Sequence, residues 1–121
     1  EAVVHTFDFS GVNTFISECY RVLKPGGIMF LTTPNAHSLT NLIRIIECNT
    51  PVFFRPHVRE YGARETANML REHKFKINSL ETENVWHELN DEKRNWIRNF
   101  VISNRGNVAL MENDTIIIAS K

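Results

Sequence analysis

The sequence predicts a layered α/β fold, and three observations lead to this class. The segment "IMFL" at residues 28–31 is apolar without alternation, which is typical of a strand covered on both faces inside a sheet. A β-branched run, "TIIIA" at 115–119, lies near the end of the chain and indicates a second buried strand. Apolar residues at helical spacing occur before and between these runs. The resulting order is helix, strand, helix, loop, helix, strand, helix and strand.

The first helix is expected over residues 11–24, and Ser10 is a candidate N-cap. Lys24-Pro25-Gly26-Gly27 cannot continue this helix, because proline lacks an N–H and glycine readily adopts a positive φ. A strand is expected next at 27–33, and Pro34 ends it because proline cannot donate to a sheet. The apolar stripe that predicts the helix consists of Val12, Phe15, Ile16, Cys19, Tyr20 and Leu23.

The middle of the chain predicts two further helices joined by a long loop. A short helical stripe covers 39–46, with Ser38 as its candidate cap. Residues 48–62 contain two prolines and no period, so we expect a connection of about 15 residues, a length at which loops are often functional. The next helix is expected to begin at residue 62 or 63 and to end near 74.

The last third of the chain predicts an edge strand, a helix and the closing strand. Polar residues dilute the apolar positions at 76–85, which is typical of an edge. A helix is expected at 89–103, with Trp96 on its core side, and the turn at 104–107 ends it. Three strands are therefore expected, two of which have the composition of central strands. A sheet of this kind lacks a neighbour on one side.

Composition excludes several functional classes. The 121 residues suit a single domain, with 42% hydrophobic and 23% charged residues. Fourteen basic residues balance fourteen acidic ones, so we do not expect nucleic acid as a partner. The apolar runs are far shorter than the roughly 20 residues that span a membrane, and no basic start with an apolar stretch opens the chain, so we expect a cytoplasmic protein. Cys19 and Cys48 lack the spacing of a zinc site or a disulfide framework.

Three segments carry a resemblance to a known family. They are "FISECYRVLKPGGIMFLTTPN" at 15–35, "HVREYGARETANMLREHKFKI" at 57–77 and "NDTIIIASK" at 113–121. They resemble the helices and strands in the C-terminal half of class I S-adenosylmethionine (SAM)-dependent methyltransferases. The resemblance implies one domain, residues 1–121, with a partial Rossmann-like methyltransferase fold of three layers. The implied sheet is mixed, and its last strand is antiparallel.

The resemblance also implies a function and site residues. "EAVVHTFDF" at 1–9 is similar to the end of the family's fourth strand, with Val4 in place of an acidic residue and His5 retained near the sulfonium of the cofactor. The parent enzyme would methylate a small molecule or a saccharide, with SAM as cofactor and without a metal. The implied catalytic residues are His5 and His57, with His5 also binding the cofactor. The implied substrate-binding residues are Thr33, Pro34, Asn35, Arg59, Glu60 and Tyr61.

The cofactor-binding half of this family has no counterpart in the sequence. Family members hold the nucleoside with a glycine-rich loop, because glycines let the backbone approach the ligand closely. No G-x-G occurs among the 121 residues. We therefore expect a fragment, inactive alone, that binds its missing N-terminal half through the open sheet edge.

Two alternatives remain open for such a chain. It is a stand-alone binding or oligomerisation module, in which residues 2–9 supply a replacement strand or two chains pair as a homodimer. Otherwise it is one half of a split enzyme, whose nucleotide-binding half is another polypeptide.

Overall fold

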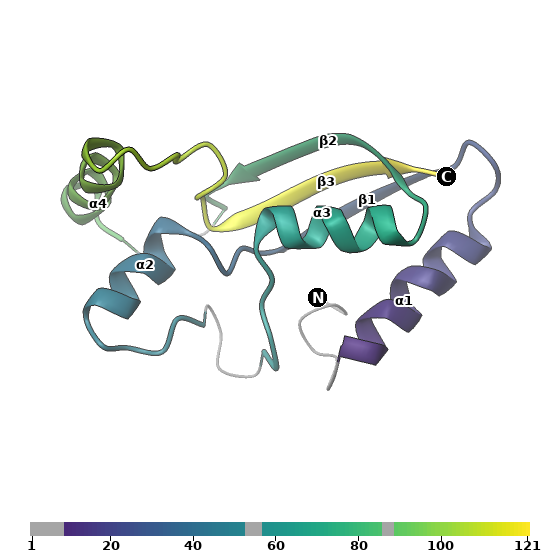
Figure 1. The fold of residues 1–121 in the computed structure, drawn as a ribbon, viewed down its shortest axis with the longest axis horizontal. Helices are drawn as coiled ribbons and strands as arrows, with labels where there is room; N and C mark the ends of the chain where they lie inside the picture. Colours follow the sequence, from purple (N-terminus) through teal and green to yellow (C-terminus); the bar gives the residue numbers. More distant parts are fainter. Residues whose placement is uncertain (1–8, 53–56, 86–88) are drawn as a thin grey trace.

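The computed structural model describes residues 9–52, 57–85 and 89–121. His5 lies outside these ranges, as does most of the alternating run at 2–9, whose last residue begins the first helix. Within the described ranges the element order agrees with the order expected from the sequence (Figure 1). The elements are α1 (Phe9–Val22), β1 (Ile28–Pro34), α2 (Leu39–Ile46), α3 (Ala63–Glu72), β2 (Lys76–Glu83), α4 (Asp91–Ser103) and β3 (Asp114–Ser120).

The three strands form one sheet in the order β1-β3-β2. β3 lies in the middle and is antiparallel to both neighbours, so β1 and β2 point the same way. The prediction of an antiparallel last strand is thus confirmed, as is that of β2 as an edge strand. All strand pairs among the described residues are antiparallel, so the mixed sheet stays a prediction.

The sequence "KPGG" at residues 24–27 forms a tight turn between α1 and β1. Gly26 has φ +76°, a backbone conformation that glycine adopts at little cost, and Pro25 precedes it with the φ that this kind of turn needs. The N–H of Gly27 donates to the carbonyl of Lys24 at 2.8 Å. The turn therefore closes α1 and points the chain directly into β1.

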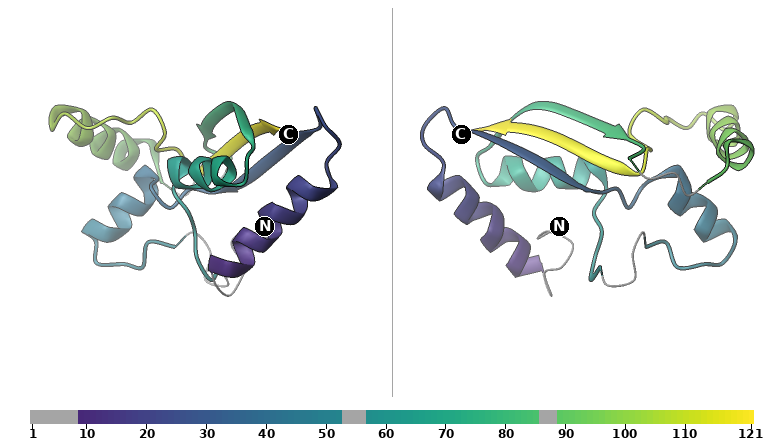
Figure 2. Two further views of the ribbon diagram at one scale, coloured as in Figure 1. Left: turned by 45° about the vertical axis from the view of Figure 1, so that its right-hand side comes forward. Right: turned by 180° about the vertical axis from the view of Figure 1, so that it is seen from behind.

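α1 and α3 lie on the same face of the sheet and build the main core with it (Figures 1 and 2). From α1 to β3, side chains with almost no exposed surface meet in one cluster. Its largest aliphatic members are Val12, Ile16, Leu70 and Ile117. The described residues thus form two layers, one of helices and one of strands, and a third layer stays a prediction.

The other face of the sheet is exposed in the part of the chain that the structure describes. Ile28 and Phe30 of β1 are each 65% exposed, while Met29 and Leu31 pack against the main core. The expectation that residues 28–31 are covered on both faces is therefore met on one face only. No described helix lies over the opposite face (Figure 2).

A second, smaller core joins α2 to α4 beyond the carboxyl end of β1. Leu39 and Ile43 of α2 are buried against Ile97 of α4. The predicted cap at Ser38 is confirmed, since its hydroxyl accepts the Asn41 N–H at 3.1 Å. None of the helices in the described ranges is long and apolar enough to cross a membrane.

The predicted core position of Trp96 is wrong. Its side chain is 55% exposed and stacks on Phe100, with ring centroids 6.1 Å apart. The neighbouring Ile97 is the residue that is completely buried. α4 is rotated so that this isoleucine, rather than the tryptophan, faces α2.

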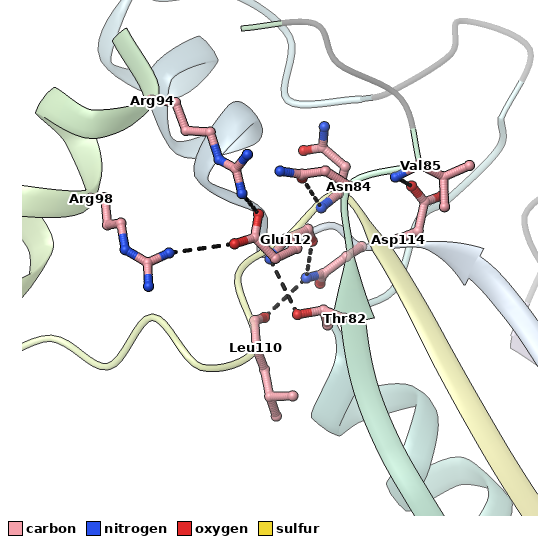
Figure 3. Close-up of polar contacts among 10 residues, drawn as sticks. Thr82, Asn84, Val85, Arg94, Arg98, Leu110, Glu112 and Asp114 are labelled. Carbon is pink, nitrogen blue, oxygen red and sulfur yellow. Dashed lines mark hydrogen bonds and ion pairs between the residues drawn. The ribbon is translucent and has the colours of Figure 1, made fainter. Parts of the chain in front are cut away.

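Glu112, in the segment between α4 and β3, ties α4 to the sheet (Figure 3). Its carboxylate accepts from the guanidinium groups of Arg94, at 2.5 Å, and Arg98, at 3.4 Å. Its backbone N–H donates to the hydroxyl of Thr82 at 3.3 Å. These bonds fix the segment that precedes β3, which forms one wall of the region described next.

Candidate functional site

The carboxyl end of β1 meets the segment that leads into α3. Asn35, the residue after β1, forms a parallel bridge with Tyr61. The N–H of Ala36 donates to the Tyr61 carbonyl at 3.1 Å. This pairing brings the two groups of predicted site residues, 33–35 and 57–61, to one place in the fold, although more than 20 positions separate them in the sequence. Ligands in open α/β sheets commonly bind beyond the carboxyl ends of strands.

Asn35 anchors this region from within. It is 1% exposed, and its side-chain amide donates to the carbonyls of Leu110, at 3.0 Å, and Glu112, at 2.8 Å. Its Oδ1 accepts the N–H groups of His37 and Ala63. The side chain thereby joins the loop after β1, the start of α3 and the segment before β3. Its predicted contact with substrate stays a prediction.

His57 and Glu60 form a buried pair beside this anchor. Nδ1 of His57 lies 2.7 Å from Oε1 of Glu60, and the two side chains are 8% and 2% exposed. A carboxylate at Nδ1 favours the tautomer with its proton there and makes Nε2 the basic nitrogen. This is the arrangement that general bases use.

Asp114 adds a second carboxylate near Glu60. It is the first residue of β3 and pairs with Pro34 across the sheet. Burial raises the pKa of the Asp114 carboxyl, and the negative charge of Glu60 raises this pKa further. The Val85 N–H donates to Asp114 at 3.2 Å (Figure 3) and lowers the pKa, but by less than burial raises it. The carboxyl end of β1 is therefore an acidic corner.

Arg59 and Tyr61 stabilise the approach to α3. The guanidinium of Arg59 lies 4.5 Å from the centroid of the buried Tyr61 ring and forms an ion pair with Glu65 at 2.5 Å. Glu65 in turn accepts the Gly62 N–H at the start of α3. These contacts order the segment that carries His57, while substrate binding by Arg59 and Tyr61 stays a prediction.

Thr33 and Pro34, the remaining predicted contacts, end β1. Thr33 is buried on the core face opposite Thr115, and neither hydroxyl has a hydrogen-bond partner among the described residues. Pro34 is half-buried on the other face. Both lie at the predicted end of the strand, and their roles also stay predictions.

The structure adds a cavity that sequence reasoning missed. It has a volume of about 210 Å³ and lies between the start of α3 and the segment after α4. The two walls are some forty positions apart in the chain and share no motif, so no pattern in the sequence could reveal them. The lining residues are His37, Ala63, Arg64, Asn107, Ala109, Leu110 and Met111.

The described residues do not form a complete site for SAM. The cavity is smaller than the roughly 300–1,000 Å³ of sites that enclose a drug-sized ligand. The sequence offers no glycine-rich loop for a nucleoside. Within the ranges that the structure describes, no three His, Cys, Asp or Glu side chains are placed to hold a metal ion.

Comparisons with known proteins identify the fold. No family model and no curated protein matches the sequence. Among solved structures, the chain is similar to a SAM-dependent methyltransferase from Archaeoglobus fulgidus, with a TM-score of 0.60 and 20% sequence identity. The match covers 98% of this chain and 55% of that one, so the chain spans about half the length of its structural relative. The chain has a methyltransferase-like fold.

Proposed function

We propose that this chain is the acceptor-side, C-terminal half of a SAM-dependent methyltransferase that acts on a small molecule or a saccharide. The observation that carries the proposal is the exposure of β1, which is an edge strand among the described residues and has one uncovered face. Its outer face exposes Ile28 and Phe30, and the methyltransferase with the same fold is nearly twice as long as the matched region. The missing half of the fold is the partner that suits this surface.

The two edges of the sheet differ in a way that supports this partner. β2 carries Lys76, Glu81 and Glu83 and has a register shift between Ile77 and Ser79. Charges and bulges of this kind prevent further strands from adding to an edge. β1 carries no charged residue and no such shift. The β1 edge is therefore suited to pairing, and we assign it to a strand of the nucleotide-binding half.

The division of labour follows from what each part can bind. SAM supplies an electrophilic methyl group when it is bound, and we assign its binding to the missing half because the residues described here do not fit it. This chain contributes the acceptor side. There, His57, held by Glu60 at 2.7 Å, takes a proton at Nε2 from a hydroxyl or amine of the acceptor.

The experiment compares two polypeptides. SAM is titrated calorimetrically into residues 1–121 and into the natural polypeptide, translated from its own start codon. We expect micromolar binding by the natural polypeptide and no heat from residues 1–121. Circular dichroism of the shorter chain, with the helix content of the structure, controls for its folding.

Three outcomes would overturn all or part of the proposal. Micromolar binding by residues 1–121 would place the cofactor site in this half. A natural polypeptide that does not bind SAM would overturn the statement that both halves belong to one polypeptide, and would leave the split enzyme or the binding module. A stable dimer of residues 1–121 that protects β1 would favour a binding or oligomerisation module with the same fold.

A further inference from the structure

The 210 Å³ cavity has a floor and a rim of different chemistry. Ala63, Leu110 and Met111 contribute apolar surface, and Met111 also packs against the core between α2 and α4. His37, Arg64 and Asn107 contribute nitrogen donors. An apolar wall with a few convergent polar groups is the usual composition of a small-molecule site.

The rim carries a positive charge without an acidic counterpart. Arg64 forms no ion pair within the described part of the chain, and its neighbour Glu65 is bound to Arg59. Among the described residues, no aspartate or glutamate lines the cavity. Asn107 uses its Oδ1 to accept the Ala109 N–H at 2.9 Å, which leaves its amide nitrogen as a donor. The cavity therefore offers donors and a cation to whatever enters it.

The donors at the start of α3 are largely used by the protein itself. Glu65 accepts the Gly62 N–H, and Asn35 accepts the Ala63 N–H. The helix terminus is thus satisfied internally, and recognition of a ligand is left to side chains. Gly62 has a separate role, because a Cβ atom there would overlap the imidazole of His37. The absence of a side chain at Gly62 allows His37 to lie beside Arg64 at the cavity.

We propose that this cavity binds the acceptor through an anionic group, a carboxylate or a phosphate. The anion lies against Arg64, with His37 and Asn107 as further donors, and an attached ring or chain lies against Leu110 and Met111. The volume suits one end of a molecule rather than a whole drug-sized ligand. The term "acceptor" rests on the proposed function, whereas the binding of the anion does not.

The position of the cavity relates it to the buried pair. Ala63 binds Asn35 directly, and Asn35 bridges to Tyr61, the residue next to Glu60. Asn35 therefore lies between the cavity and the buried pair, and we place the part of the acceptor beyond the ring or chain toward the carboxyl end of β1. The reacting group of the acceptor belongs to that part.

The test uses small probes and residues 1–121. Benzoate, its neutral isostere benzamide, and phenyl phosphate are titrated into the ¹⁵N-labelled chain and followed by amide chemical shifts. We expect benzoate and phenyl phosphate to shift the amides of residues 63–64 and 107–111, with a Kd on the order of 1 mM for probes of this size. Benzamide is expected to bind at least about fivefold more weakly, because it lacks the charge.

Matched variants test whether benzoate binds in this cavity and whether Arg64 at its rim holds the carboxylate. Arg64→Gln is expected to weaken benzoate binding about fivefold, whereas Arg71→Gln, at the other end of the same helix and exposed, leaves it unchanged. Ala109→Phe fills the exposed mouth without changing charge and is expected to abolish the shifts. Greater affinity for phenyl phosphate than for benzoate would identify a phosphate as the anion. Greater affinity for benzoate would identify a carboxylate.

Equal binding of benzoate and benzamide, or equal effects of the two arginine variants, would overturn the proposal. Neither SAM nor methyl transfer enters these titrations. Failure of the anion site therefore leaves the proposed function standing. If the SAM titration fails but the anion still binds, the cavity remains an anion site, and its ligand is no longer identified as a methyl acceptor.

Discussion

Nδ1 of His57 lies 2.7 Å from Oε1 of Glu60, and the protein buries both side chains at the start of the segment that leads into α3. Removing one member of a buried pair leaves the other without compensation for its lost hydration. Glu60→Ala is therefore expected to lower the free energy of unfolding by about 1–3 kcal/mol. Glu60→Gln keeps an oxygen that can accept from Nδ1 and is expected to cost less. Urea unfolding at pH 7 measures both, and equal losses would show that the bond to His57 contributes nothing.

The raised pKa of Asp114 predicts a pH dependence of stability. Burial is the main cause, so the fold favours the protonated carboxyl. The stability from this group is full below the unfolded pKa, near 3.8, and is lost as the pH rises through the folded pKa. Asp114→Asn keeps an acceptor for the Val85 N–H and removes the charge. It is expected to raise Tm by about 1–2 °C at pH 7, because the group is partly exposed, and to leave Tm unchanged below pH 3.8.

A matched control distinguishes this effect from a general loss of negative charge. Asp91 is exposed in the first turn of α4, where a carboxylate interacts favourably with the helix terminus. Asp91→Asn is expected to lower Tm at pH 7, the opposite sign. If both variants change Tm in the same direction, burial is not what raises the pKa of Asp114.

Gly26 is expected to tolerate asparagine better than alanine. Its φ of +76° lies where a Cβ atom is strained, at a cost of roughly 1–2 kcal/mol, and asparagine adopts this region more readily. No atom lies close to the position of an added Cβ, so backbone strain alone determines the result. Thermal unfolding of Gly26→Ala and Gly26→Asn compares the two. Equal stability of Gly26→Ala and wild type would contradict the positive φ.

Phe30→Lys tests what covers the open face. In residues 1–121 the side chain is 65% exposed, so the substitution is expected to change stability by less than about 1 kcal/mol. In the natural polypeptide the lysine would be buried without a partner, and we expect a loss above about 2 kcal/mol. Val22→Lys, an equally exposed apolar position at the end of α1, is expected to have a small effect in both. Small effects of Phe30→Lys in both polypeptides would mean that nothing covers β1.

Much of the fold was predictable because local signals and packing agree. The "KPGG" turn, the cap at Ser38 and the unbroken apolar run at 28–31 each specify one local geometry, and the structure has all three. The apolar stripe of α4 does not specify the rotation of the helix, because it covers too many adjacent positions. It contains both Trp96 and Ile97, so periodicity alone cannot fix which of them faces α2.

The candidate site was only partly predictable for a different reason. Proximity of Asn35 to residues 57–61 follows from sheet topology, which the family resemblance implies. The bonds from Asn35 to the segment before β3, and the cavity against Arg64, depend on how the segment 104–112 returns to the sheet. That segment has neither a period nor a motif, so its path is set by tertiary contacts such as those of Glu112 with Arg94 and Arg98.

The most direct test of the open sheet edge is amide hydrogen exchange in β1, whose two sides differ in this chain. Alternate amides of residues 28–33 bond to β3, and the others point to the edge at which no described strand pairs. In residues 1–121 we expect the edge-facing set to exchange at least about 100-fold faster than the set bonded to β3. In the natural polypeptide both sets are expected to be protected alike, because another strand pairs there. Edge-facing amides of β1 that still exchange rapidly in the natural polypeptide would contradict the assignment of this chain as one half of a larger sheet.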